Sequence, residues 1–206
     1  MGTRVRLPLV AGLLVLFGMT APTVLRADVC GSISNNLVLN CGFESGESDW
    51  TVIHAPVGSF IGVFPTIPVH SGSEALLIGA WAGQNDYIYQ NLPTWPGEKV
   101  AITFYLAVDP NTWPTAGEFV ANWNGTNIFT LTGTGGVSSF DTYTAYSFIE
   151  TATSDSTQLE FGGNNPPSNY YLDDVSAVDL PEPSGAMLLG SGLLGLAGLA
   201  KRRFLS

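Results

Sequence analysis

The chain has 206 residues, 17 of them acidic and seven basic, and a formal net charge of −10. The basic residues lie almost entirely in the terminal segments 1–27 and 181–206, so the region from Asp28 to Glu182 keeps Lys99 alone against all 17 acids. Its net charge of −16 excludes binding to nucleic acids and anionic lipid surfaces, whereas neutral glycans, divalent cations and basic partners are compatible with it.

Residues 1–27 have the layout of a secretory signal peptide. Arg4 and Arg6 supply a positive start, residues 7–19 form an uncharged and mostly apolar stretch, and the small residue Ala27 precedes Asp28. This order of charge, apolar stretch and small residue is typical of a leader removed during export, with cleavage within several residues of Ala27. An uncleaved N-terminal anchor is the alternative.

The only two cysteines are Cys30 and Cys41, and both follow the predicted leader. With ten residues between them and an exported location, we expect a disulfide that closes a short loop and contributes about 2–3 kcal/mol. A metal pair is the alternative, but no third or fourth ligand stands at zinc-like spacing.

The region 28–180 is long enough for one domain with its own core, and its pattern is β throughout. Short runs rich in aromatic and β-branched residues alternate with glycine and proline turns, clearest in residues 101–106 and 143–148. Outside the terminal segments, no helical period exceeds about two turns and no internal repeat occurs, so we predict an all-β, antiparallel β-sandwich. The expected strands are Asn36–Asn40, Trp50–Ile53, Ser59–Phe64, Ala75–Ala80, Tyr87–Leu92, Val100–Val108, Glu118–Trp123, Asn127–Leu131, Asp141–Ile149, Gln158–Phe161 and Tyr170–Val178.

Three short segments refine the fold prediction. The opening Asn36–Gly46, the central Val69–Leu76 and the closing Tyr170–Val178 resemble the jelly-roll domains of the galactose-binding-like group, which include carbohydrate-binding modules. In those domains an opening N-G-G-F-E and a closing L-D-D-V lie side by side on the first and last strands. This chain departs from the pattern at Cys41, which replaces the first glycine, so the disulfide is expected to hold that turn.

The resemblance implies a structural calcium ion, because similar modules bind Ca²⁺ between the opening glutamate and an aspartate of the closing motif. Here the ligands would be Glu44 and either Asp173 or Asp174, completed by backbone carbonyls near residues 71–74. Neighbouring strand residues point to opposite faces, so only one of the two aspartates is expected to ligate. The alternative is that these acids cap turns or face solvent.

Nothing in the sequence indicates catalysis. His54 and His70 stand 16 residues apart outside any ligand motif, and no G-x-S-x-G nucleophile turn occurs. The closest tandem of acids, Glu47 and Asp49, lacks the third acid that sandwich glycosidases place on the same strand. We therefore expect a non-enzymatic protein.

Aromatic side chains in turns suggest a second possibility, which is binding of a sugar ring by stacking. Trp95 and Trp113 lie among prolines and glycine or asparagine in turn-like surroundings, and Trp123 stands between two asparagines. Exposure in a loop is what a binding platform needs. Packing over a loop or a sheet edge is the alternative for each of the three.

The C-terminal segment predicts the destination of the protein. Pro181, Glu182 and Pro183 precede an uncharged stretch, residues 184–200, which basic residues follow at 201–203. A helix of that stretch rises about 26 Å, slightly less than a bilayer core of about 30 Å. The three parts resemble the PEP-CTERM sorting signal of Gram-negative bacteria. An ordinary C-terminal anchor, or a tail helix that does not span, is the alternative.

That resemblance implies an inner-membrane precursor, cleavage near Pro181–Pro183 by an exosortase-type protease-transpeptidase, and transfer to the cell surface or an exopolysaccharide matrix. Two functions fit an exported domain of this kind. One is a structural or adhesive matrix component, and the other is a lectin-like module that binds exopolysaccharide through loop tryptophans.

Overall fold

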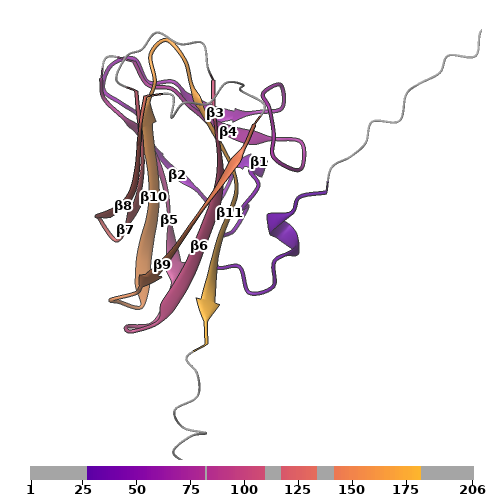
Figure 1. Ribbon diagram of the computed structural model, residues 1–206, viewed down its shortest axis with the longest axis vertical. Coiled ribbons are helices and arrows are strands. Elements are labelled where there is room, and N and C mark those ends of the chain that lie inside the picture. Colours follow the sequence, from indigo (N-terminus) through magenta and orange to yellow (C-terminus); the bar gives the residue numbers. More distant parts are fainter. Residues whose placement is uncertain (1–26, 82, 110–116, 134–141, 182–206) are drawn as a thin grey trace, which may run out of the picture.

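Two antiparallel sheets of five strands each face one another in the computed structural model, which describes residues 27–81, 83–109, 117–133 and 142–181 (Figure 1). The strands are β1 (Glu44–Glu47), β2 (Thr51–Ile53), β3 (Ile61–Phe64), β4 (Ala75–Ile78), β5 (Asp86–Pro93), β6 (Lys99–Val108), β7 (Glu118–Trp123), β8 (Thr126–Thr132), β9 (Thr144–Thr151), β10 (Ser156–Asn164) and β11 (Tyr170–Leu180). One sheet has the order β2-β5-β10-β7-β8 and the other the order β3-β4-β11-β6-β9. The predicted all-β antiparallel sandwich is confirmed.

Ten of the expected strands overlap strands of the structure, and one does not. Asn36–Asn40 is not a strand, because within it only Asn36 forms a β-bridge, to Val178, and Asn40 has a left-handed backbone with φ of 45°. The Asn40 side chain instead donates hydrogen bonds to the carbonyls of Gly46 and Ser48 and so holds the following turn. The short strand β1 was not predicted.

Aromatic side chains fill the space between the sheets. The ring of Phe104 on β6 is fully buried and lies 5.1 Å from the ring of Phe161 on β10 and 6.0 Å from that of Phe119 on β7. Along β6, inward residues are buried and alternate residues are partly exposed, as the sequence alternation over 101–106 predicted. The β3-β4-β11-β6-β9 sheet is also covered on part of its other face, where Leu77, Ala107 and Tyr171 form a smaller buried cluster.

The two ends of the domain lie against one another. The Leu37 amide donates to the Ala177 carbonyl at 2.8 Å, and the Val175 amide donates to the Cys41 carbonyl at 2.9 Å. This places the opening segment beside β11, as the resemblance to jelly-roll domains implied. The Cys30–Cys41 disulfide is formed, which confirms that prediction.

The chain leaves the sandwich at Pro181, directly after β11 (Figure 1). The predicted leader before Ala27, the motif residues Glu182 and Pro183, and the apolar stretch 184–200 lie outside the described residues. Within the described ranges, no helix has the length and apolar character needed to cross a bilayer.

Candidate functional site

Asp173 and Asp174 lie in a β-bulge of β11, and their carboxylates approach the same segment of chain. The bulge falls between Asp173 and Ser176 in the pairing with β6, and Asp174 adopts a left-handed backbone with φ of 47°. Both aspartates therefore reach residues 70–71, and the expected placement on opposite faces does not hold. The bulge interrupts the regular alternation of a strand.

The Asp173 carboxylate is surrounded by backbone N–H groups. It accepts hydrogen bonds from the amides of His70 at 2.7 Å and Ser71 at 3.2 Å, and from the amide of Asp174 at 2.8 Å. Its side chain is fully buried. Burial, and then the neighbouring Asp174, raise the pKa of Asp173 to about 8, against the opposing effect of these amides.

Asp174 binds two separate parts of the chain. Its carboxylate accepts from the Ser71 hydroxyl at 2.9 Å and the Cys30 amide at 3.3 Å, and it contacts Nδ1 of His70. The His70 ring stacks on the Tyr105 ring with centroids 3.6 Å apart. Asp174 thus ties the last strand to the disulfide region and to the segment before β4.

Glu44 contacts the same loop, but farther along it. Its carboxylate accepts from the Ser73 amide at 2.8 Å, from the Ser73 hydroxyl at 2.6 Å and from the Glu74 amide at 3.1 Å. A side chain at Gly72, where φ is +61°, would overlap this carboxylate. The glycine therefore allows the loop to close over Glu44.

The three predicted calcium ligands do not form a calcium shell as they stand. N–H and O–H groups of residues 70–74, rather than carbonyl oxygens, face the carboxylates of Glu44, Asp173 and Asp174. Among the described residues, the one group of three potential ligands close enough to share an ion is Asp28, Cys30 and Cys41, and both sulfurs are in the disulfide. Calcium binding by Glu44 with Asp173 or Asp174 stays a prediction.

The calcium prediction has a thermal consequence. Protein dialysed against a chelator is expected to melt at a lower temperature than protein in calcium, because a ligand at 100 times its Kd stabilises the folded state by about 2.7 kcal/mol. Differential scanning calorimetry of the full chain measures the shift, and Glu44→Gln should remove it. Equal melting temperatures would mean that hydrogen bonds fasten the chain ends without metal.

The three predicted sugar-binding tryptophans differ in whether they are described and in how exposed they are. Trp123 is 4% exposed, and its indole Nε1 donates to the Thr151 carbonyl at 3.2 Å, so it packs in the core and cannot stack on a ligand. Trp113 lies outside the described residues. Trp95 is 73% exposed in the turn between β5 and β6 and remains available for contact.

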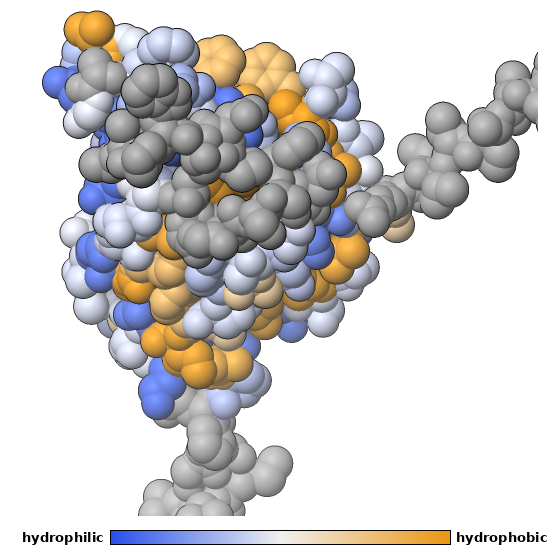
Figure 2. Space-filling view, turned by 45° about the horizontal axis from the view of Figure 1, so that its top comes forward, coloured by the Kyte–Doolittle hydropathy of each residue, from blue (hydrophilic) through white to orange (hydrophobic). Residues whose placement is uncertain are grey.

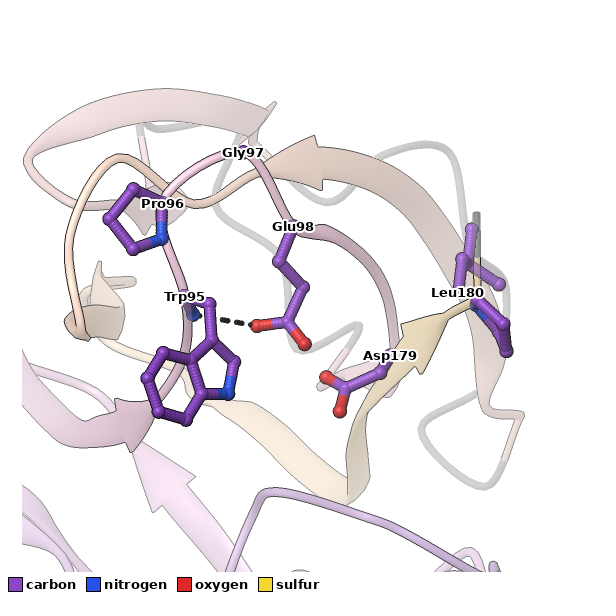
Figure 3. A pocket seen from close by; sticks show the side chains of 7 residues that line it. Trp95, Pro96, Gly97, Glu98, Asp179 and Leu180 are labelled. Carbon is purple, nitrogen blue, oxygen red and sulfur yellow. Dashed lines mark hydrogen bonds between the residues drawn. The ribbon is translucent and has the colours of Figure 1, made fainter. Parts of the chain in front are cut away.

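Trp95 borders a small surface cavity of about 400 Å³ at the point where the chain exits (Figure 3). The carboxyl groups of Glu98 and Asp179 face each other beside it, and Glu98 also accepts a hydrogen bond from the Trp95 amide at 2.9 Å. Burial, and then the neighbouring Glu98, raise the pKa of Asp179 above its usual range. Trp95 supplies the one aromatic ring among the residues that line this cavity.

A second polar and aromatic surface lies on the outer face of the β2-β5-β10-β7-β8 sheet. Tyr87 and Tyr89 on β5 point away from the core, since their neighbours along the strand are buried. In the sheet register Tyr89 stands beside Glu160 on β10, which stands beside Asn122 on β7. The Asn122 amide donates to the Glu160 carboxylate at 2.9 Å. We call this surface the outer face.

The ring of Tyr87 lies over the sheet because the residue beside it is a glycine. Gly162 on β10 pairs with Tyr87, and a Cβ at position 162 would overlap the tyrosine ring. On the far side of Gly162, the Val120 side chain is also within contact distance of that position. The close approach requires glycine, and it lays the half-buried ring across the strands.

At the end of the outer face, a cavity of about 520 Å³ opens between the β2–β3 loop, the β4–β5 loop and the ends of β7 and β10. We call it the polar pocket. Its polar lining comes chiefly from His54, Asn85, Tyr87, Glu118 and Asn164. Nδ2 of Asn85 donates to Glu118 at 3.3 Å and to the Tyr87 hydroxyl at 3.4 Å, and Nδ2 of Asn164 donates to Oδ1 of Asn85.

One atom of this network has no partner. Oδ1 of Asn164 is buried and accepts no hydrogen bond from the residues that the structure describes, although Asn164 is only 6% exposed. A buried acceptor without a donor costs free energy, so we expect a water molecule or a ligand to supply the donor. No motif in the sequence signals this pocket. The alternation in Asp86–Asn91 signals outward tyrosines, but no local signal pairs Tyr87 with Gly162.

Comparisons with solved structures concern the fold. One match is the carbohydrate-binding module TmCBM61 in complex with β-1,4-galactotriose, with a TM-score of 0.53 and 16% identity over 71% of this chain and 100% of that chain. Another is the C-terminal family 22 carbohydrate-binding module of Clostridium thermocellum Xyn10B, with a TM-score of 0.50 and 16% identity over 71% and 96%. The chain has the jelly-roll fold of carbohydrate-binding modules.

The jelly roll also occurs in an enzyme. The enzymatically active domain of tailspike protein 4 from bacteriophage CBA120 matches with a TM-score of 0.53 and 12% identity, over 71% of this chain and 22% of that chain. No family model matches the sequence, and no curated protein matches it. At these identities the likeness shows the fold, and function has to be argued from the surface of this chain.

Proposed function

We propose that this protein is a non-enzymatic carbohydrate-binding module, and that it binds glycan on the outer face and in the polar pocket. The observation that carries the proposal is the ring of Tyr87, packed over Gly162 beside the unpartnered Asn164 acceptor. A flat aromatic ring suits the apolar face of a sugar, and neighbouring amides and carboxylates suit its hydroxyls. Tyr87 and Asn164 combine both in one cavity of ligand size.

Two further observations support this function. The outer face carries Tyr89, Asn122 and Glu160 in line with the pocket, so a chain of several sugar units has contacts along the strands. The similar modules include one bound to galactotriose and one described for the role of its cleft in ligand binding. Figure 2 shows apolar and hydrophilic side chains mixed over the visible surface.

The experiment that tests the proposal is affinity electrophoresis of the full chain in gels that contain one soluble polysaccharide each. A polyoxyethylene detergent should keep the apolar C-terminal stretch in solution, since a sugar-headed detergent would compete for the site. We expect retardation by at least one of galactan, xylan, mannan, β-glucan and chitosan. Unchanged mobility in every gel would contradict carbohydrate binding.

We also propose that the module is exported and sorted to the cell surface or extracellular matrix. This proposal is supported by the leader-like residues 1–27 and by the disulfide. It is also supported by the C-terminal order of Pro181–Pro183, an apolar stretch and a basic tail. The processing partner would be an exosortase-type enzyme acting at Pro181, Glu182 and Pro183 on an inner-membrane precursor. Pro181 follows β11 directly, so cleavage there would release an intact sandwich.

Intact mass spectrometry of the protein from the envelope and medium of its host tests this sorting. We expect a polypeptide that begins near Asp28 and ends near Pro181–Ser184, with or without an added group. A mass that retains residues 201–206 would contradict processing and leave a permanent anchor.

A further inference from the structure

We propose that the polar pocket binds the protonated primary amine of an amino sugar, so that the preferred ligand is a glycan with free amino groups. This inference rests on the proposed carbohydrate binding and specifies its ligand class. It starts from Asn164 and Glu118, which are paired across β10 and β7 and both line the pocket.

The orientation of the Asn85 amide determines which atoms of the pocket remain open. The Glu118 carboxylate can only accept, so the group facing it must be the NH₂ of Asn85. Oδ1 of Asn85 then accepts from Nδ2 of Asn164, and Oδ1 of Asn164 is left without a partner. The Asn85 contact uses Oε1 of Glu118 and leaves Oε2 of that carboxylate to another donor. Adjacent strands thus offer two acceptors, Oδ1 of Asn164 and Oε2 of Glu118.

The number of hydrogen-bond donors on a ligand group decides whether that group can satisfy both acceptors of the pocket. A sugar hydroxyl and an acetamido N–H each carry one hydrogen, which satisfies one acceptor and leaves the other bare. An ammonium group carries three donors and can reach both Asn164 and Glu118 at once. The charge-assisted hydrogen bond to the carboxylate is also stronger than a neutral one.

The charges around the pocket favour a cation. Glu118 is the acidic residue of its lining, neither lysine nor arginine is among the residues that line it, and Lys99 lies on β6 in the opposite sheet. The one basic side chain of the lining is that of His54, whose Nδ1 lies 2.9 Å from the Ser59 hydroxyl. Tyr87 also lines the pocket, and the face of an aromatic ring attracts a cation. The region from Asp28 to Glu182 has a net charge of −16, which attracts polyamines and repels polymers of uronic acids.

The test measures affinities of the full chain, in a polyoxyethylene detergent, for three matched oligosaccharide series. These are β-1,4-linked glucosamine, its fully N-acetylated form and the β-1,4-glucose series, titrated calorimetrically at about pH 6, below the pKa of primary amines. We expect the glucosamine series to bind at least tenfold more tightly than the other two. Glu118→Gln should remove most of this preference, whereas Glu150→Gln on β9 in the opposite sheet changes net charge equally and should keep it.

The outcomes separate the inference from the proposed function. Equal binding of the three series would overturn the amine site and leave carbohydrate binding intact, whereas absence of binding to any glycan in the electrophoresis panel would remove both. An equal loss of preference in Glu118→Gln and Glu150→Gln would assign the preference to net charge rather than the pocket. Competition by polylysine as strong as by glucosamine oligomers would show a site for any ammonium group, which also overturns an amino-sugar site.

Discussion

Replacement of Tyr87 by alanine is expected to weaken glycan binding by about 30-fold, with little change in the fold. The substitution removes a half-buried ring whose stacking on a sugar contributes about 2 kcal/mol, through buried apolar area and ring geometry. It also removes the hydroxyl that accepts from Asn85. Calorimetric titration with the glycan that retards the parent most strongly measures the change.

Trp95→Ala is the matched control for Tyr87→Ala. Trp95 lies beyond the opposite end of β5 from Tyr87, a strand of eight residues that spans about 23 Å. If the outer face is the binding surface, Trp95→Ala should keep parental affinity. The reverse result, with affinity lost on removal of Trp95 and kept on removal of Tyr87, would move the site to the cavity beside Glu98 and Asp179.

Replacement of Trp123 by alanine is expected to lower the free energy of unfolding by about 3–5 kcal/mol, the range for large aromatic residues in a core. The indole is 4% exposed, and its removal leaves a void and an unpaired Thr151 carbonyl. For a domain of this size the melting temperature should fall by roughly 6–20 °C. Thermal unfolding followed by circular dichroism measures the loss.

Two companion variants separate packing from hydrogen bonding at this position. Trp123→Phe retains much of the volume and should cost less than the alanine variant, while Trp95→Ala on the surface should change stability by no more than about 0.5 kcal/mol. A Trp123→Ala protein that melts like the parent but no longer binds glycan would restore Trp123 as a ligand contact and contradict its assignment to the core.

The strands were predictable because their information is local. Alternating polar and apolar residues along β6 correspond to one face on the core and one face outward, and the structure repeats that pattern. The tryptophans show what local sequence patterns do not predict, which is the exposure of a particular side chain. Trp123 stands between two asparagines in the sequence, but the pleat of β7 turns the indole inward, whereas the turn before β6 exposes Trp95.

The aspartate pair in β11 shows a different limit. The rule that neighbours in a strand face opposite ways fails because Asp174 adopts a left-handed backbone within a bulge. The donors that accompany this conformation, the amide of Ser71 and the ring of His70, are about a hundred residues away in the chain. Likewise, the ring of Tyr87 can lie over the sheet because of Gly162, which only the pairing of β5 with β10 brings beside it.

The position of β11 in its sheet governs when the protein can fold. This last strand lies in the centre, hydrogen-bonded to β4 on one side and β6 on the other, and it also receives the opening segment. A chain still being synthesised therefore lacks the middle of this sheet until residues 170–180 are made. The β3–β4 and β6–β9 pairs cannot join into one sheet before that, so this sheet closes in a late step. Afterwards, a pull applied at Pro181 acts along a central strand with partners on both sides, which is the placement that best resists extraction.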